Sequence, residues 1–262
     1  MGDWNLTFDR AHEHIEQLDV EIKRFLQDNP YGIRLDVKSE PGYAVAKAFK
    51  RLEPPEHLSS LIGDAVQNLR SSLDQLVYAL SRDASGNVVP GTEFPVFTSE
   101  DDFDRREKKG IPARGSGIYK MRALGSAEQD IVRRVQPYHR GDDATLDRLW
   151  ILHDTAVIHR HRHLHLTGAI IGQIGLGIIA MDNVNLHLIH QRGGAFDDGQ
   201  EVARYLLTVV GPNPRLNAHF NSAMDVAFSP AGPFGGKIVV RALSELSDMV
   251  EDLIAELEVF VK

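Results

Sequence analysis

The feature that most constrains the fold of this chain is one long apolar stripe between residues 56 and 81. Apolar residues recur there every three to four positions, which is the spacing of one face of an α-helix. Pro54 and Pro55 stand directly before the stripe and favour a helix start after them. The stripe consists of Leu58, Leu61, Ile62, Ala65, Leu69, Leu73, Leu76 and Leu80. A helix with such a face has to bury it, so we expect Leu61, Ala65, Leu69, Leu73 and Leu76 to form the centre of a helical core.

Other parts of the chain show either helical or extended spacing. Helical patterns predict helices over residues 7–29, 99–109, 126–136, 142–161 and 239–261. Alternation on both sides of Pro41-Gly42 predicts a β-hairpin over residues 31–52. Further strands are expected at residues 163–174, 184–191, 201–210 and 216–229. The rest of residues 83–125 is irregular, and its glycine-rich loop at 110–125 suggests no particular role.

The order of these elements favours an α+β fold rather than a repeated βαβ pattern. We expect residues 1–162 to form a helical half that carries the hairpin at 31–52. Residues 163–262 are then a mostly antiparallel β region followed by a C-terminal helix that packs back on the first half. A chain of 262 residues can also form one continuous domain of this kind.

Composition excludes several classes of protein. The chain is 42% hydrophobic and has no cysteine, which excludes a wholly disordered chain, a disulfide scaffold and thiolate metal sites. The most apolar stretch, residues 167–181, is shorter than the roughly 20 residues of a membrane helix, and no signal peptide pattern is present. Residues 175–180 match the GxGxxA form of a dinucleotide site, but a turn and a strand follow where a helix is needed. We therefore expect a cytoplasmic protein with no membrane contact and no cofactor.

Charge is unevenly distributed along the chain, whose formal net charge is −8. Residues 104–148 carry 11 lysines and arginines against 7 acids, whereas residues 242–262 carry six acids and one lysine. The basic region can face a phosphate-bearing ligand, or it can contact the acidic last helix. The sequence leaves both interpretations open.

Three polar residues stand at the borders of the apolar stripe. Asn68 and Arg70 fall near its opposite borders, and Asp74 lies one helical turn after Arg70, where the two can pair. Such residues can form a network that pins the helix to its neighbours. Alternatively, Arg70 lines a groove that binds a phosphate or another anion.

Histidines and arginines alternate from His159 to His165. His159 and His163 have a spacing that can hold a metal in a helix and are the candidate metal ligands, but the interleaved Arg160 and Arg162 repel a cation, so the pattern favours the absence of a metal site. If the helix before this run packs antiparallel on the helix with Arg70, residues near 160 lie close to residues 64–70. We therefore expect Asn68, Arg70, Arg160 and Arg162 to line an anion-binding groove together with His161.

The segment GDAVQNLRSSLDQLVYAL, together with TEFPVF, LWILHD and HRHRHL, resembles an uncharacterised bacterial, largely actinobacterial, protein family. Asn68, Arg70 and Asp74 match the family helix, whereas Gln67 and Gln75 stand where the family has histidine. That helix is also similar to the signature of the HEPN superfamily, an arginine followed by a histidine after four to six residues. The resemblance implies a helical half of HEPN type and a homodimer that cuts RNA without a metal. The absence of a histidine at Gln75 puts that activity in doubt.

Three functions follow from these observations. The first is a binding protein for an anionic small molecule, RNA or another partner, acting through the Arg/His-lined groove. The second is a ribonuclease-like enzyme or its degenerate relative, with Arg70, Asp74, His161 and His165 as candidate catalytic residues. The third is a histidine-rich metal-binding protein.

Overall fold

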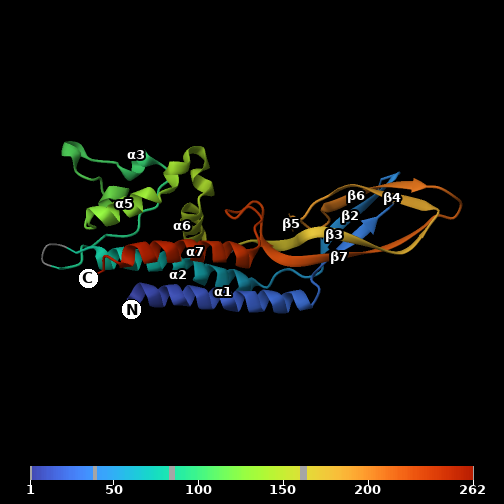
Figure 1. Cartoon of the computed structure of the whole chain (residues 1–262), viewed down its shortest axis with the longest axis horizontal. Coiled ribbons are helices and arrows are strands. Elements are labelled where there is room, and N and C mark those ends of the chain that lie inside the picture. The colour runs from blue at the N-terminus through green and yellow to red at the C-terminus, as the bar shows by residue number, and fades with distance from the viewer. Residues whose placement is uncertain (1, 38–39, 83–85, 160–163, 262) are drawn as a thin grey trace. The chain divides into compact units, whose positions relative to one another are not determined.

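The protein has an α+β fold, as the sequence predicts. The computed structural model describes residues 2–37, 40–82, 86–159 and 164–261, and these contain long helices and antiparallel sheets. The chain forms two compact units (Figure 1). The helical unit consists of Met1–Leu18, Ser60–His163 and Val240–Lys262, and the β unit consists of Asp19–Ser59 and Leu164–Val239.

Three long helices lie mainly in the helical unit: α1 (Asp3–Gln27), α2 (Glu56–Leu80) and α7 (Val239–Glu258). Residues 19–27 of α1 and 56–59 of α2 belong to the β unit. Figure 1 shows the three helices side by side. The hydroxyl of Thr7 on α1 donates a hydrogen bond to Gln75 of α2 at 2.9 Å, and Ser247 of α7 is hydrogen-bonded to His12 of α1 at 3.1 Å. The apolar stripe of α2 is buried as predicted, with no exposed surface at Ala65, Leu69, Leu73 and Leu76. Leu61 is only half-buried, at the border of that face.

Residues 81–159 form short helices on this unit: α3 (Glu100–Phe103), α4 (Gly117–Lys120), α5 (Ser126–Arg134) and α6 (Arg148–His159), with 3₁₀ turns at Lys108–Gly110 and Pro137–Leu146. The helix predicted over residues 99–109 is only four residues long. Ser99 caps its start, and Lys109 has the left-handed φ of 68°, which a continuing helix does not allow. The helix predicted from residue 142 begins later, because Gly141 has a φ of 58° and the following residues form a 3₁₀ turn.

The β unit contains two antiparallel sheets, with strand orders β1-β2-β6-β4 and β5-β3-β7. The strands are β1 (Tyr31–Asp36), β2 (Tyr43–Lys50), β3 (Leu166–Asp182), β4 (Val184–Gln191), β5 (Gly194–Phe196), β6 (Glu201–Val209) and β7 (Arg215–Phe228). Strand β3 continues well past the predicted end at residue 174. Gly172 lies in an irregularity between Ile171 and Gly175, where the register with β7 shifts.

The two units are interleaved along the chain, which differs from the expected division near residue 162. Strand β2 pairs with β6, from Tyr43 opposite Leu206 to Lys47 opposite Glu201, so the hairpin belongs to the β unit. This pairing satisfies backbone groups of β2 that a hairpin alone would leave open. The last helix, α7, belongs to the helical unit. None of the helices in the described ranges has the length and apolar content that a membrane crossing requires.

Candidate functional site

The arginine singled out from the sequence, Arg70, is the centre of a closed polar contact that we call the Arg70 clamp (Arg70, Asp74 and Phe94). Its Nη2 donates to the carbonyl oxygen of Phe94 at 2.6 Å and lies 3.0 Å from Asp74 Oδ1. The N–H of Phe94 donates to the same Asp74 oxygen at 2.9 Å. The backbone carbonyl and the backbone N–H of Phe94 are therefore both hydrogen-bonded to side chains of helix α2. These two bonds hold the segment around Phe94 against that helix.

Further charges surround the clamp and balance it. Lys120 Nζ lies 2.7 Å from Glu93, next to Phe94 in the chain. Burial raises the pKa of Asp74, an effect that the charge of Glu93 reinforces and that Arg70, Lys120 and the Phe94 N–H only partly oppose. Burial also acts to raise the pKa of Glu93, but Lys120, Arg70 and His153 outweigh it, so that this pKa is lowered.

The contacts of Arg70 favour the packing interpretation over the anion-binding one. Its side chain is 7% exposed, and its charge is matched by Asp74. Nη1 is buried and has no hydrogen-bond partner among the described residues, so this part of the guanidinium is enclosed by the protein. An anion would have to displace Asp74 or open the packing to reach it.

The other residues of the predicted site are only partly described. Asn68 is half-buried, and the neighbouring Gln67 donates to the carbonyl oxygen of Ala156, which joins α2 to α6. His165 is exposed and lies in the β unit. Arg160, His161, Arg162, His163 and the side chain of His159 lie outside the described residues. The structure therefore brings Arg70 and Asp74 together. It does not test whether Arg160, His161 and Arg162 line the predicted groove.

Among the residues that the structure describes, no group of three or more histidines and carboxylates is arranged to hold a metal ion. His190 on β4 instead lies 3.0 Å from Glu201, as a pair with one carboxylate. The pair formed by His159 and His163 falls in the part of the chain that is not described.

The basic region at residues 104–148 lies against the acidic last helix. We call the cavity between them the α7 groove; it measures about 420 Å³ and is lined by Arg134, Val135, Gln136, His139, Arg140, Asp147, Arg148, Leu149, Asp248, Met249, Asp252, Leu253 and Glu256. Arg134 pairs with Glu256, and Arg148 donates to the carbonyl oxygen of Glu245 at 3.5 Å. These contacts favour the second interpretation of the basic region, a contact with α7. Charges of both signs line the groove, so it does not select an anion.

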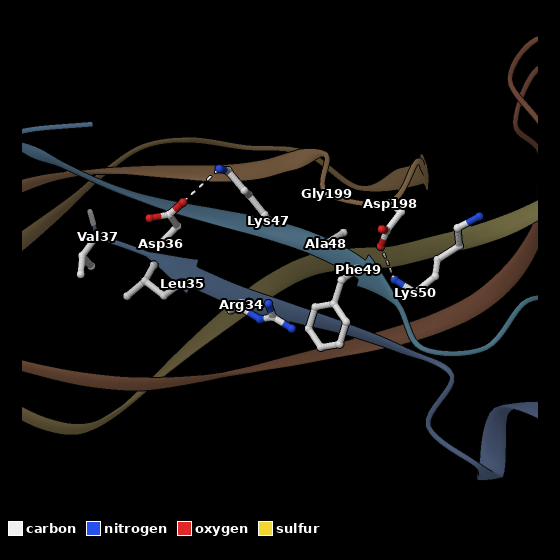
Figure 2. Close-up of a pocket in the computed structure, with 10 residues that line it drawn as sticks. All are labelled: Arg34, Leu35, Asp36, Val37, Lys47, Ala48, Phe49, Lys50, Asp198 and Gly199. Atoms are coloured by element: carbon white, nitrogen blue, oxygen red, sulfur yellow. Dashed lines mark hydrogen bonds and ion pairs between the residues drawn. The ribbon is translucent and has the colours of Figure 1, made fainter. Parts of the chain in front are cut away.

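A larger cavity lies on the β-hairpin, and we call it the hairpin groove. It measures about 510 Å³ and is lined by Arg34, Leu35, Asp36, Val37, Lys47, Ala48, Phe49, Lys50, Asp198 and Gly199. Figure 2 shows that β1 and β2 supply most of these residues, while Asp198 and Gly199 come from the turn before β6. That turn is held by the backbone N–H of Lys50, which donates to Asp198 at 2.8 Å, and by the N–H of Gly199, which donates to Ala48 at 2.8 Å.

Arg34 and Phe49 form the middle of the hairpin groove. The guanidinium carbon of Arg34 lies 4.7 Å from the centre of the Phe49 ring, and that of Arg51, just after the end of β2, lies 5.2 Å from it. The ring lies over Gly32, where a Cβ atom would come within 2.6 Å of the ring edge. Glycine at position 32 therefore makes room for the aromatic ring that holds Arg34.

The cations of this groove are not equally compensated. Arg34 stands directly opposite Lys47 in the antiparallel register, and like charges in that position repel. Lys47 donates to Asp36 at 3.0 Å, whereas Arg34 is exposed and makes no hydrogen bond or ion pair within the described ranges. The groove thus presents one uncompensated guanidinium held by an aromatic ring.

Sequence reasoning identified the hairpin but not this groove. The signal was the alternation of Lys47, Phe49 and Arg51, which places a ring and two cations on one face of a strand. The contribution of Asp198 and Gly199 depends on the pairing of β2 with β6, which local spacing does not reveal.

Comparisons with known proteins identify no relative of this chain. No family model matches it, and neither do any of the curated proteins or solved structures that were searched. The resemblance to a bacterial family and to HEPN proteins stays a prediction, and the functional argument depends on the geometry of the chain.

Proposed function

We propose that the protein is a binding protein for a small ligand that carries a phosphate or carboxylate group, and that the ligand binds in the hairpin groove. The observation that carries this proposal is the exposed, uncompensated guanidinium of Arg34, held 4.7 Å from the Phe49 ring and opposite Lys47. An anion between Arg34 and Lys47 would relieve the repulsion between these two cations.

The chemistry of the groove suits a ligand with both an anionic and an apolar part. A guanidinium offers two parallel N–H groups to phosphate or carboxylate oxygens, and stacking on a ring limits its motion before binding. Phe49, Leu35 and Val37 supply apolar surface beside it. A cavity of 510 Å³ falls within the roughly 300–1,000 Å³ typical of small-molecule sites.

The lining of the groove supports binding rather than catalysis. It contains no histidine, and each of its two carboxylates already accepts a hydrogen bond, Asp36 from Lys47 and Asp198 from the Lys50 backbone. A general base would need a free carboxylate or imidazole beside the ligand. The ribonuclease and metal-binding alternatives gain no support from the described residues, and the cytoplasmic location stays a prediction.

Isothermal titration tests the proposal with adenosine monophosphate, inorganic phosphate and adenosine as probes. We expect the monophosphate to bind more tightly than either part alone, and its binding to weaken as salt is added. Arg34→Ala should weaken binding about tenfold or more, the loss of roughly 1.4 kcal/mol that one charge-assisted contact can supply. Arg34→Lys should restore only part of it, because lysine lacks the planar fork.

The matched control is Arg105→Ala, which removes an exposed arginine of the helical unit. It should leave binding unchanged. A wild-type protein that binds none of the anionic probes at millimolar concentration would overturn the proposal, and so would an Arg34→Ala variant that binds like the wild type. A short single-stranded RNA titrated in the same way tests the RNA alternative.

A further inference from the structure

One end of the β unit exposes many large apolar side chains. We define this apolar end by nine residues on β3, on β4 and at the end of β6: Ile171, Ile178, Ile179, Met181, Leu188, Ile189, Leu206, Val209 and Val210. Their exposed fractions run from 38% at Met181 to 62% at Ile179. These nine are half of the 18 large apolar side chains that are exposed in the described chain. They come from β3 of one sheet and from the paired strands β4 and β6 of the other, and an exposed apolar set of this size marks a surface that another molecule covers.

The strands of the apolar end also have open edges. Strand β5 pairs with β3 only from Gly168 to Ile170. Beyond that, from Gly175 to Asp182, the ladder partner of β3 among the described strands is β7, and the two long strands run together in Figure 1. A two-stranded ribbon is marginally stable alone, and its unpaired N–H and C=O groups are a template for another strand.

The apolar end carries almost no charge. Between residues 171 and 191 the only charged residue of the Asp, Glu, Lys and Arg types is Asp182, and between residues 205 and 224 it is Arg215. These two residues stand opposite each other in the β3–β7 register, so their charges cancel. The chain as a whole has a net charge of −8. Two copies therefore repel each other least when their apolar ends meet.

We infer that a second copy of this chain covers the apolar end and forms a homodimer with two-fold symmetry. An open antiparallel edge can pair with the same edge of another copy around a two-fold axis, and that pairing would continue the sheet across the interface. The isoleucines and leucines of both copies would be buried together. A membrane surface fits less well, because lipid-binding surfaces place basic residues beside the apolar ones, and here Arg215 faces Asp182.

The available surface is large enough for this assembly. A stable interface takes about 800 Å² and some 20–30 residues from each partner. Residues 171–190, 205–210 and 215–223 provide more than that number, on the paired strands β3 and β7 of one sheet and on the paired strands β4 and β6 of the other. The dimer does not depend on the proposed ligand, because the hairpin groove is lined by other residues.

Sedimentation velocity over a range of micromolar concentrations tests the inference. The wild-type protein should sediment at about 58 kDa, twice the chain mass of 29.2 kDa. Ile179→Lys and, as a second variant on another strand, Ile189→Lys should sediment at 29.2 kDa, because each places a charge in the interface. Both side chains are at least half exposed, so the fold should survive, and circular dichroism melts verify this.

The matched control is Val259→Lys, which changes an apolar side chain that is 72% exposed after helix α7, outside the apolar end. It should remain dimeric. A wild-type protein of 29.2 kDa at every concentration would overturn the inference. Variants that stay dimeric, or a control that dissociates as readily as they do, would also overturn it, because the interface would then lie elsewhere.

Discussion

Replacing Arg70 with methionine separates the two interpretations of this buried arginine. Methionine keeps much of the length and apolar contact of the side chain but removes the charge. The carbonyl oxygen of Phe94, a residue with no exposed surface, loses the donor that lies 2.6 Å away. Asp74 keeps its hydrogen bond from the Phe94 N–H but loses its cation at 3.0 Å.

The expected loss of stability can be estimated from these two contacts. A buried acceptor left without a donor costs about 1–3 kcal/mol. The side chain of Asp74 is 35% exposed, so the loss of its cation falls between the roughly 0–1 kcal/mol of a surface pair and the roughly 3–5 kcal/mol of a fully buried one. We expect Arg70→Met to lower the free energy of unfolding by about 3 kcal/mol.

Urea denaturation followed by tryptophan fluorescence measures this change directly. Both tryptophans, Trp4 and Trp150, lie in the helical unit together with the clamp. A cycle with Asp74→Asn and the double variant should give a coupling free energy of about 1–2 kcal/mol between the two side chains. Arg105→Met, at an exposed position, should change stability by less than about 0.5 kcal/mol. If Arg70→Met also changed the free energy of unfolding by less than about 0.5 kcal/mol but abolished anion binding, Arg70 would be a ligand-binding residue and the clamp interpretation would be wrong.

Three further predictions concern the buried Leu69 and Gln136 and the half-buried Asp225, each measured by denaturation of the purified variant. Leu69→Ala should lower the free energy of unfolding by about 2–5 kcal/mol, because it opens a cavity at a fully buried position, and a loss below about 0.5 kcal/mol would contradict the assignment of the core face. Gln136→Ala should cost about 1–3 kcal/mol, since this buried amide accepts from the N–H of Phe97 at 3.1 Å and donates to the carbonyl of Pro95 at 2.8 Å; an unchanged midpoint would refute this. Asp225→Asn should raise the midpoint at pH 7. Burial raises the pKa of Asp225, so the folded state favours the protonated form, and wild-type stability falls as pH rises through the range above the ordinary aspartate pKa. The advantage of the asparagine variant should therefore shrink toward pH 4, and an advantage that grows on acidification would contradict this sign.

Much of the fold follows from local spacing in the sequence. The stripe on α2 predicts both the helix and six of its fully buried residues, and the turn at Pro41-Gly42 predicts the hairpin. Leu61 departs from the prediction because it lies where the stripe meets the solvent-facing side. The helix predicted over residues 99–109 is only the single turn α3, and the single turn α4 was not predicted. Single turns of this kind depend on burying one side chain, as α3 buries Phe103, rather than on a repeated pattern.

The candidate site shows where local reasoning ends. A buried, paired arginine and a ligand-binding arginine look alike in a sequence, and the difference at Arg70 depends on Phe94, which is 24 residues away. In the sequence, nothing distinguishes Arg34 from other exposed arginines. Only the strand register shows that it lies opposite Lys47 and beside Phe49. The turn that closes the groove meets Lys50 from 148 residues further along the chain.

Amide hydrogen exchange of the wild-type protein, with and without adenosine monophosphate, tests the central claim most directly. If the ligand binds in the hairpin groove, exchange should slow in residues 31–37, in residues 43–50 and in the turn at residues 197–200. Exchange in the α2 segment around Arg70 and in the segment around Phe94 should stay the same. Slower exchange at Arg70 and Phe94 instead, with no change in the hairpin, would contradict the account and return the binding site to the helical unit.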